Sequence, residues 1–211
     1  FVSTGWEAIK LPGLTKVLAA LFIYPIIGFA SGFIFTRLTY FLAQHATPRI
    51  NDFFKRSQLV TAIILGLSHG TNDAQKSMGI IVLGLVISGR LQSFEVPLWV
   101  TVASAASMAI GTSLAGWKII RTLGGKFYKI RPLHSFATQL TSGIVILSAS
   151  FFGAPVSTSH VVSSAIIGVG ASERLSKVRW SVAGDILTAW LITIPVSAAF
   201  AAGFYWLLTS L

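Results

Sequence analysis

The sequence has 211 residues, of which 54% are hydrophobic and only 10% charged, with a formal net charge of +10 and no cysteine. Soluble domains carry about 25% charged residues, so this composition excludes an ordinary soluble domain and predicts a chain embedded in lipid. The lack of cysteine excludes a disulfide framework and a thiolate metal site, and we expect no metal site. The basic residues fall between apolar segments, which favours control of membrane topology over nucleic-acid binding.

Apolar stretches predict four membrane-spanning helices, at about residues 14–42, 58–88, 96–117 and 182–210. About 20 apolar residues cross a hydrocarbon core of roughly 30 Å, so each stretch is long enough to span. The second stretch differs from the others because polar and charged residues interrupt it. We expect it to cross the membrane nevertheless.

A fifth apolar stretch predicts a helical hairpin at about residues 134–172. Residues 135–172 carry no charge and, at about 1.5 Å per residue, can reach across the core roughly twice. Gly153-Ala154-Pro155 lies at the centre and predicts the turn. The sequence leaves open whether the two legs span fully or re-enter partway. The predicted fold is an all-α polytopic membrane protein, with one transmembrane domain over residues 1–211 that holds four full spans and this hairpin.

Basic residues concentrate in three predicted loops, at 43–57, 118–133 and 173–179. Loop 88–95 holds only one base and one acid. If the hairpin returns to the side where it begins, the three basic loops fall on the same side of the membrane. By the positive-inside rule that side is the cytoplasm, and both ends of this chain lie outside.

The polar segment of the second span contains Asn72, Asp73, Gln75 and Lys76, with glycines at positions 66, 70 and 79. Charged groups at membrane depth usually face a partner or a pathway, and glycine weakens a helix. We therefore expect a broken helix that restarts near residue 74, with Asp73 capping its second half. Broken helices of this kind form ion and substrate sites in transporters.

The residue types in this segment predict a coupling-ion site. A carboxylate such as Asp73 can ligate a hard cation such as Na⁺, or carry a proton. We expect Asn72 and Asp73 to hold the coupling ion, and Gln75 and Lys76 to contact the substrate. The alternative is an internal Asp73–Lys76 pair, three residues apart on a helix, that closes the kink and binds no ligand.

A second polar motif, Pro155 to His160, lies at the predicted hairpin tip. Pro155 suits the first turn of a helix that runs onward. Ser157, Thr158 and Ser159 then present hydroxyls beside unpaired backbone N–H groups, which is a cradle for an oxyanion such as phosphate or sulfate. The alternative is that these hydroxyls only bond back to the preceding turn, as Ser and Thr often do in membrane helices.

Together the two motifs resemble the inorganic phosphate transporter family, often called PiT. Its Gly-x-Asn-Asp signature is matched by Gly70-Thr71-Asn72-Asp73, and its Pro-Val-Ser-Thr-x-His element by Pro155 to His160. In that family the signature occurs twice, in two inverted halves, whereas this chain holds one copy and does not begin with Met. The resemblance therefore implies the C-terminal half of a bacterial low-affinity phosphate permease in the plasma membrane.

The resemblance implies secondary active transport of inorganic phosphate by proton or sodium symport, without an enzymatic activity or a cofactor. Lys76 departs from relatives with Asn at this position, and a Lys beside Asp73 can substitute for a cation, which favours proton coupling. The expected partners are phosphate, the lipid bilayer and the missing N-terminal repeat, without nucleic acid. The ion stoichiometry, the co-transport of a metal and a homodimer are left open.

Three other functions remain as alternatives. The same cradle suits sulfate or another tetrahedral oxyanion. Ser157, His160 and Asp73 include the residue types of an intramembrane hydrolase, but no Gly-x-Ser-x-Gly elbow accompanies them. A half-transporter that binds without translocating describes this chain taken alone.

Overall fold

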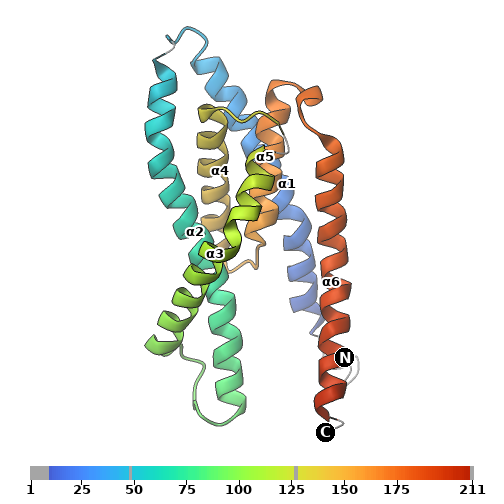
Figure 1. Cartoon of the computed structure of the whole chain (residues 1–211). Coiled ribbons are helices and arrows are strands. Elements are labelled where there is room, and N and C mark those ends of the chain that lie inside the picture. The colour runs from blue at the N-terminus through green and yellow to red at the C-terminus, as the bar shows by residue number, and fades with distance from the viewer. Residues whose placement is uncertain (1–9, 48, 126–127, 210–211) are drawn as a thin grey trace.

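The computed structural model describes residues 10–47, 49–125 and 128–209, and within them all regular secondary structure is helical. Six α-helices and one short 3-10 helix follow in chain order (Figure 1): α1 (Leu11–Leu42), α2 (Ile50–Ile87), α3 (Leu98–Gly125), α4 (Pro132–Phe151), α5 (Thr158–Glu173), η2 (Leu175–Lys177) and α6 (Trp180–Thr209). The all-α prediction is confirmed for this part of the chain. Helices occupy every stretch that was predicted to span or to form the hairpin.

The expected break in the second span is wrong. Helix α2 runs from Ile50 to Ile87 without interruption, so Asp73 lies within the helix and caps nothing. A glycine inside a helix costs only about 1 kcal/mol relative to alanine. Packing of α2 along α4 outweighs that penalty. In the polar segment of α2, the Ser68 hydroxyl donates to the Ile64 carbonyl one helical turn earlier (2.6 Å).

Helices α4 and α5 form the predicted hairpin, joined by a turn over residues 152–157. Gly153 has a φ of +61°, a backbone conformation that glycine adopts without strain, so it permits the tight reversal. Helix α5 begins at Thr158 with Ser157 as its N-cap, and the placement of Pro155 in its first turn is therefore wrong. Pro155 lies in the turn instead.

The hairpin turn lies near the middle of the molecule's height (Figure 1). The 16 residues of α5 extend about 24 Å at 1.5 Å per residue, which is shorter than a hydrocarbon core of about 30 Å. The turn is therefore placed beside the centre of α2, where the polar segment lies.

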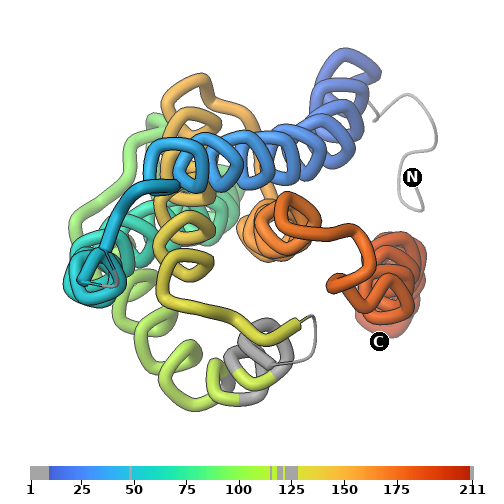
Figure 2. The backbone as a smooth tube through the Cα atoms, turned by 90° about the horizontal axis from the view of Figure 1, so that it is seen from above, coloured from blue at the N-terminus to red at the C-terminus, as the bar shows by residue number. Residues whose placement is uncertain are grey.

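Helix α1 crosses the hairpin and packs closely against α5 (Figure 2). The two backbones almost touch: a Cβ atom added to Gly168 would lie 2.1 Å from the Phe29 carbonyl oxygen, and one added to Gly32 would lie 2.7 Å from the Ala165 carbonyl oxygen. Small residues allow such an approach between membrane helices. These glycines fix the position of α5, and with it the start of that helix at the hairpin turn.

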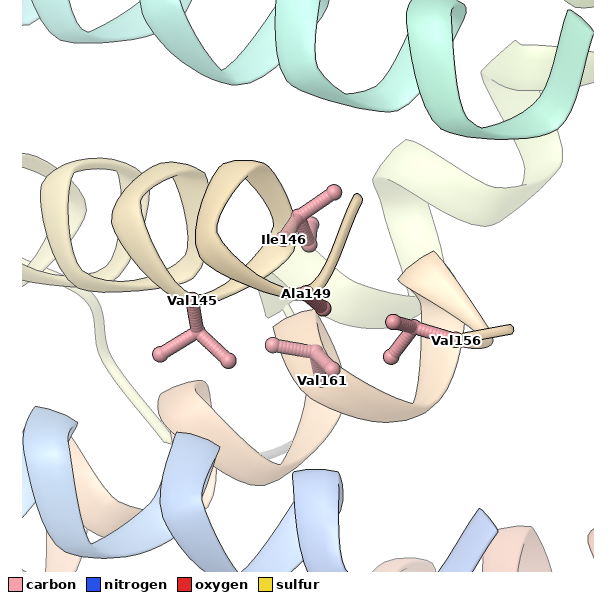
Figure 3. Packing of buried hydrophobic residues seen from close by; sticks show 5 residues of the cluster. All are labelled: Val145, Ile146, Ala149, Val156 and Val161. Atoms are coloured by element: carbon pink, nitrogen blue, oxygen red, sulfur yellow. The ribbon is translucent and has the colours of Figure 1, made fainter. Parts of the chain in front are cut away.

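A buried apolar cluster holds the two legs of the hairpin together at the turn (Figure 3). Val145 and Ala149 of α4 face Val161 of α5, and Val156 closes the cluster from the turn. All four are almost fully buried. Close packing of this kind leaves the turn little freedom to move relative to the two helices.

The described parts of the three predicted basic loops lie at the same end of the molecule, opposite the 88–97 connection, the start of α1 and the end of α6 (Figure 1). The first two of these ranges are partly helical, since α2 begins at Ile50 and α3 continues to Gly125. Among the described residues, α1 and α6 have the length and apolar composition of membrane spans by themselves. Helix α6 stands at the edge of the bundle (Figure 2) and exposes most of its apolar side chains.

Candidate functional site

The hairpin turn meets the middle of α2 and brings the two sequence motifs into contact. The buried Asn72 side chain donates from Nδ2 to the Val156 carbonyl oxygen (3.1 Å). Lys76 donates from Nζ to the same carbonyl, and the Thr158 hydroxyl donates to Asp73 Oδ2 (3.1 Å). We call the group of Asn72, Asp73, Lys76, Val156 and Thr158 the tip cluster.

The Asp73 carboxylate is the centre of the tip cluster. Its Oδ1 accepts hydrogen bonds from Asn72 Nδ2 (3.0 Å) and Lys76 Nζ (2.9 Å). Its Oδ2 accepts the Thr158 bond and lies 3.3 Å from Nδ1 of His69, one helical turn earlier. The side chain is 24% exposed, so the carboxylate is well supplied with donors and still reachable from outside.

The three hydroxyls at the start of α5 differ in exposure. Thr158 is buried against Asp73, Ser157 is half-buried and Ser159 is exposed. Ser157 has an extended backbone, and its carbonyl accepts the first helical bond, from Val161 N (3.1 Å). The backbone N–H groups of the first turn of α5 have no partner within that helix, which leaves them available to an anion. For Thr158, bonding back to the preceding turn is excluded because its hydroxyl is used on Asp73.

The structure does not bring Gln75 to the tip cluster. Its side chain is exposed. Residues two positions apart on an α-helix point about 200° apart, so Gln75 and Asp73 lie on opposite faces of α2. Lys76, three positions from Asp73, lies on the same face and joins the cluster.

Sequence reasoning assigned no role to three groups of the site, two of which lie beside the tip cluster and one within it. Ser150, near the end of α4, donates from Oγ to Asn72 Oδ1 (3.4 Å). His69 lies beside Asp73, which its spacing of four residues on one helix could have revealed. The Val156 carbonyl accepts two hydrogen bonds but carries no signal in the sequence, because it belongs to the backbone.

The arrangement does not support a hydrolytic triad. The His160 ring stacks on Trp190 of α6, with 3.8 Å between ring centroids and 19° between planes. Asp73 contacts Thr158 and His69 instead. A triad of these residues needs Asp73 bonded to His160 and His160 bonded to Ser157, and the structure shows neither of these two bonds in the part of the chain that it describes.

A second polar group lies at the opposite end of the hairpin, where α5 ends. Glu173 accepts hydrogen bonds from Tyr40 Oη and Lys177 Nζ, and its Oε1 lies 3.2 Å from His134 Nε2. His134 Nε2 is also 3.0 Å from Tyr40 Oη, and Arg131 lies 3.7 Å from the carboxylate. We call the group of Tyr40, Arg131, His134, Glu173 and Lys177 the base cluster.

The charge of Glu173 is held by its neighbours. Glu173 is the last residue of α5 and the first of the predicted basic loop 173–179, so it lies outside the predicted hairpin segment. Burial alone would raise the pKa of its carboxyl, but hydrogen bonds from Lys177 and Tyr40 and the charge of His134 outweigh burial and lower this pKa to about 2. The carboxylate is therefore ionised throughout the physiological pH range and ties α1, α4 and α5 together.

The sequence matches the phosphate transporter family (PHO4) over residues 42–201, a range that contains both motifs and the whole tip cluster. The chain belongs to this family. Membership of a transporter family places the chain in a membrane and sets it apart from enzymes.

Relatives of this family are similar along almost the whole chain. The chain is 42% identical over 208 residues to a protein of Bacillus subtilis (strain 168) described as a "Probable low-affinity inorganic phosphate transporter", covering 98% of this chain and 62% of that protein. A protein of Rhizobium meliloti (strain 1021) with the same description is 41% identical over 94% of this chain and 60% of its own length. The chain thus spans about three fifths of the length of these relatives.

A solved structure has the same fold. The structure described as "The sodium-dependent phosphate transporter" superposes with a TM-score of 0.90, covering 100% of this chain and 70% of that one. The sequences are 20% identical, so the likeness establishes the arrangement of the helices and leaves the role of each residue to the chemistry of this chain.

Proposed function

We propose that the full-length protein to which this chain belongs moves inorganic phosphate across the membrane by cation symport. The observation that carries the proposal is the hydrogen bond between Thr158 and Asp73. It joins an ion-binding carboxylate to the N-terminus of a helix, and such a terminus favours anions through its free N–H groups and its dipole. Groups for a cation and for an anion therefore share one site.

The contact between these groups explains how the two movements are coupled. A phosphate anion at the start of α5 is repelled by the negative charge of Asp73 a few Å away. A cation or proton on Asp73 removes that repulsion, and by linkage the bound phosphate then strengthens binding of the cation by the same factor. Symport follows from this reciprocal stabilisation when the site is exposed to each side of the membrane in turn.

The membrane arrangement is proposed from charge and length. The three basic loops at one end of the molecule face the cytoplasm of a bacterial plasma membrane, by the positive-inside rule. The hairpin enters from that side and turns near mid-membrane, beside Asp73. Relatives are longer than this chain, and a second repeat would supply the other wall of the site and the alternating movement.

The test is uptake of radiolabelled phosphate by the full-length protein in proteoliposomes, with sodium and proton gradients imposed independently. We expect phosphate to accumulate with at least one gradient. This uptake should persist in an excess of unlabelled sulfate. Absence of accumulation under both gradients would contradict phosphate symport. Loss of phosphate uptake in excess sulfate, together with uptake of labelled sulfate, would reassign the substrate to another tetrahedral oxyanion.

A further inference from the structure

We propose that Lys76 is a tethered cation that occupies a coupling-ion position of the tip cluster, so that phosphate uptake does not require sodium. This inference rests on the proposed function and deepens it by stating which cation the site does not need.

The contacts of the Lys76 ammonium are those of a hard cation. Its Nζ bonds Asp73 Oδ1 (2.9 Å) and the Val156 carbonyl oxygen, 80 residues away on the hairpin turn. A carboxylate oxygen and a backbone carbonyl oxygen are the ligand types that Na⁺ and other hard cations take in proteins. The ammonium thus sits between the two oxygens that a sodium ion would bridge.

The Val156 carbonyl is held in place to receive a positive charge. Asn72 Nδ2 donates to this carbonyl (3.1 Å) and to Asp73 Oδ1 (3.0 Å), so Asn72 fixes both acceptors of Lys76. The side chain of Val156 itself is buried in the apolar cluster of the hairpin, which immobilises the turn. The position is therefore built into the fold and does not depend on the lysine.

Unbroken helical geometry puts Lys76 in this position. Residues three apart on a helix lie on the same face, so the continuity of α2 through residue 76 aims Lys76 at Asp73. A sodium ion at the same oxygens would stand beside the ammonium, and two positive charges at such a distance repel each other. Lys76 therefore excludes sodium from this position.

The ammonium also has capacity for the substrate. It carries three donors, and the two bonds described above use two of them. The third can reach an oxygen of a phosphate bound at the start of α5, since Thr158 of that helix is bonded to the same carboxylate. Lys76 thus serves as both a counter-charge for Asp73 and a contact for the anion.

The chain contains a matched control for this pair. Lys55 and Asp52 lie on the same helix with the same spacing, but their charged atoms are 3.9 Å apart and their side chains are 61% and 70% exposed. The spacing alone therefore does not produce the arrangement at Lys76. Lys55→Gln removes the same charge from α2 without touching the tip cluster.

The experiment compares wild type, Lys76→Gln and Lys55→Gln as full-length proteins in proteoliposomes. Phosphate uptake is measured with sodium and with choline in its place, at a fixed pH and a fixed pH gradient. For wild type and Lys55→Gln we expect less than a twofold difference between the two salts. For Lys76→Gln we expect uptake in choline to fall at least tenfold and sodium to restore part of it, because the vacated oxygens then accept the ion.

A second readout keeps the test valid if Lys76→Gln does not transport. Sodium chloride, compared with choline chloride, should raise the melting temperature of detergent-purified Lys76→Gln and leave wild type unchanged, because only the variant binds the ion. A tenfold loss of wild-type uptake without sodium would overturn the role of Lys76 while phosphate transport stands. A Lys76→Gln protein that ignores sodium in both assays would overturn it as well. Absence of phosphate uptake by wild type under every gradient would instead contradict the proposed function.

Discussion

The two ends of the hairpin are both tied to the bundle through an acid, but the acids are held in different ways. At the tip, Asp73 is 24% exposed and bonded to a hydroxyl, an amide and an ammonium. At the base, Glu173 is 11% exposed and bonded to side chains of several helices, including His134, which is almost fully buried. The tip cluster also uses the non-helical backbone of the turn, whereas the base cluster lies where helices end.

This difference indicates that the tip cluster can exchange ligands, whereas the base cluster holds helices together. A partly exposed acid with small polar partners can give up one bond and accept a ligand in its place. A more buried acid that holds several charged groups cannot, because removing it leaves uncompensated charge. We therefore expect variants at the tip to change transport with little effect on stability, and variants at the base to do the opposite.

The largest expected effect is at the tip, from Asp73→Asn. The substitution keeps the size of the side chain but removes the charge that links the cation to the anion. Phosphate uptake should fall about 100-fold, which is the scale of a strong coupling between two sites. Uptake into proteoliposomes measures it, and Asp52→Asn, an exposed acid on the same helix, should transport normally. Normal uptake by Asp73→Asn would remove the carboxylate from the mechanism.

Gly168→Ala should affect both clusters at once, because it displaces α5, the helix that runs from the tip cluster to the base cluster. Its Cβ would lie 2.1 Å from the Phe29 backbone oxygen, so α1 and α5 must move apart. Overpacking of this kind costs about 2–3 kcal/mol. Thermal melting of the purified protein should show a marked loss of stability, together with reduced uptake.

The control for Gly168→Ala is Gly184→Ala in α6, where nothing lies within 4 Å of an added Cβ. It should melt as wild type does. If both alanine variants have wild-type stability, the close approach of α1 to α5 does not hold the hairpin.

At the base, Glu173→Gln should destabilise the fold by about 2 kcal/mol, below the range for a fully buried pair because Lys177 and Arg131 are partly exposed. Melting temperature should fall, while the phosphate concentration for half-maximal uptake stays within twofold of wild type. A changed half-maximal concentration with unchanged melting would mean that the base cluster takes part in binding.

Thr158→Val tests the bond between the two motifs and should have a smaller effect. The substitution removes the hydroxyl that donates to Asp73 Oδ2 and keeps the side-chain volume nearly constant. One such hydrogen bond contributes about 1 kcal/mol. Phosphate uptake at low substrate concentration should fall about fivefold, the equivalent of that energy. Ser159→Ala, at an exposed position, provides the comparison and should have a weaker effect.

The smallest expected effect concerns pH at the base. Because its pKa in the folded protein is about 2 and its ordinary value is 4.5, Glu173 contributes stability that is complete above pH 4.5 and lost only as pH falls towards 2. The difference in melting temperature between wild type and Glu173→Gln should therefore be the same at pH 5.5 and pH 7.5. A difference that shrinks at pH 5.5 would show that the carboxyl takes up a proton in this range.

Much of the fold and of the candidate site could be predicted because the signals are local. Apolar length marks the helices, and Gly153 and Pro155 mark the hairpin turn. The polar residues of both motifs are conspicuous because charge is rare at membrane depth. The predicted break in α2 failed because helix propensity is a weak preference that packing against α4 overrides.

Once α2 is continuous, the faces of its polar residues change. Gln75 then points away from Asp73, while Lys76 points toward it. A break near residue 74 would have left the relative direction of these side chains undetermined. One error in local structure therefore changed which predicted residues belong to the site.

The sequence by itself determined that this chain is helical and membrane-embedded, with two polar motifs and charge concentrated in three loops, because hydropathy and charge act residue by residue. Only the tertiary structure decided that the Val156 carbonyl accepts hydrogen bonds from Asn72 and Lys76, and that the Thr158 hydroxyl donates to Asp73. Those contacts join residues about 80 positions apart, and they exist because glycines let α1 pack against α5 while the apolar cluster fixes the turn beside α2.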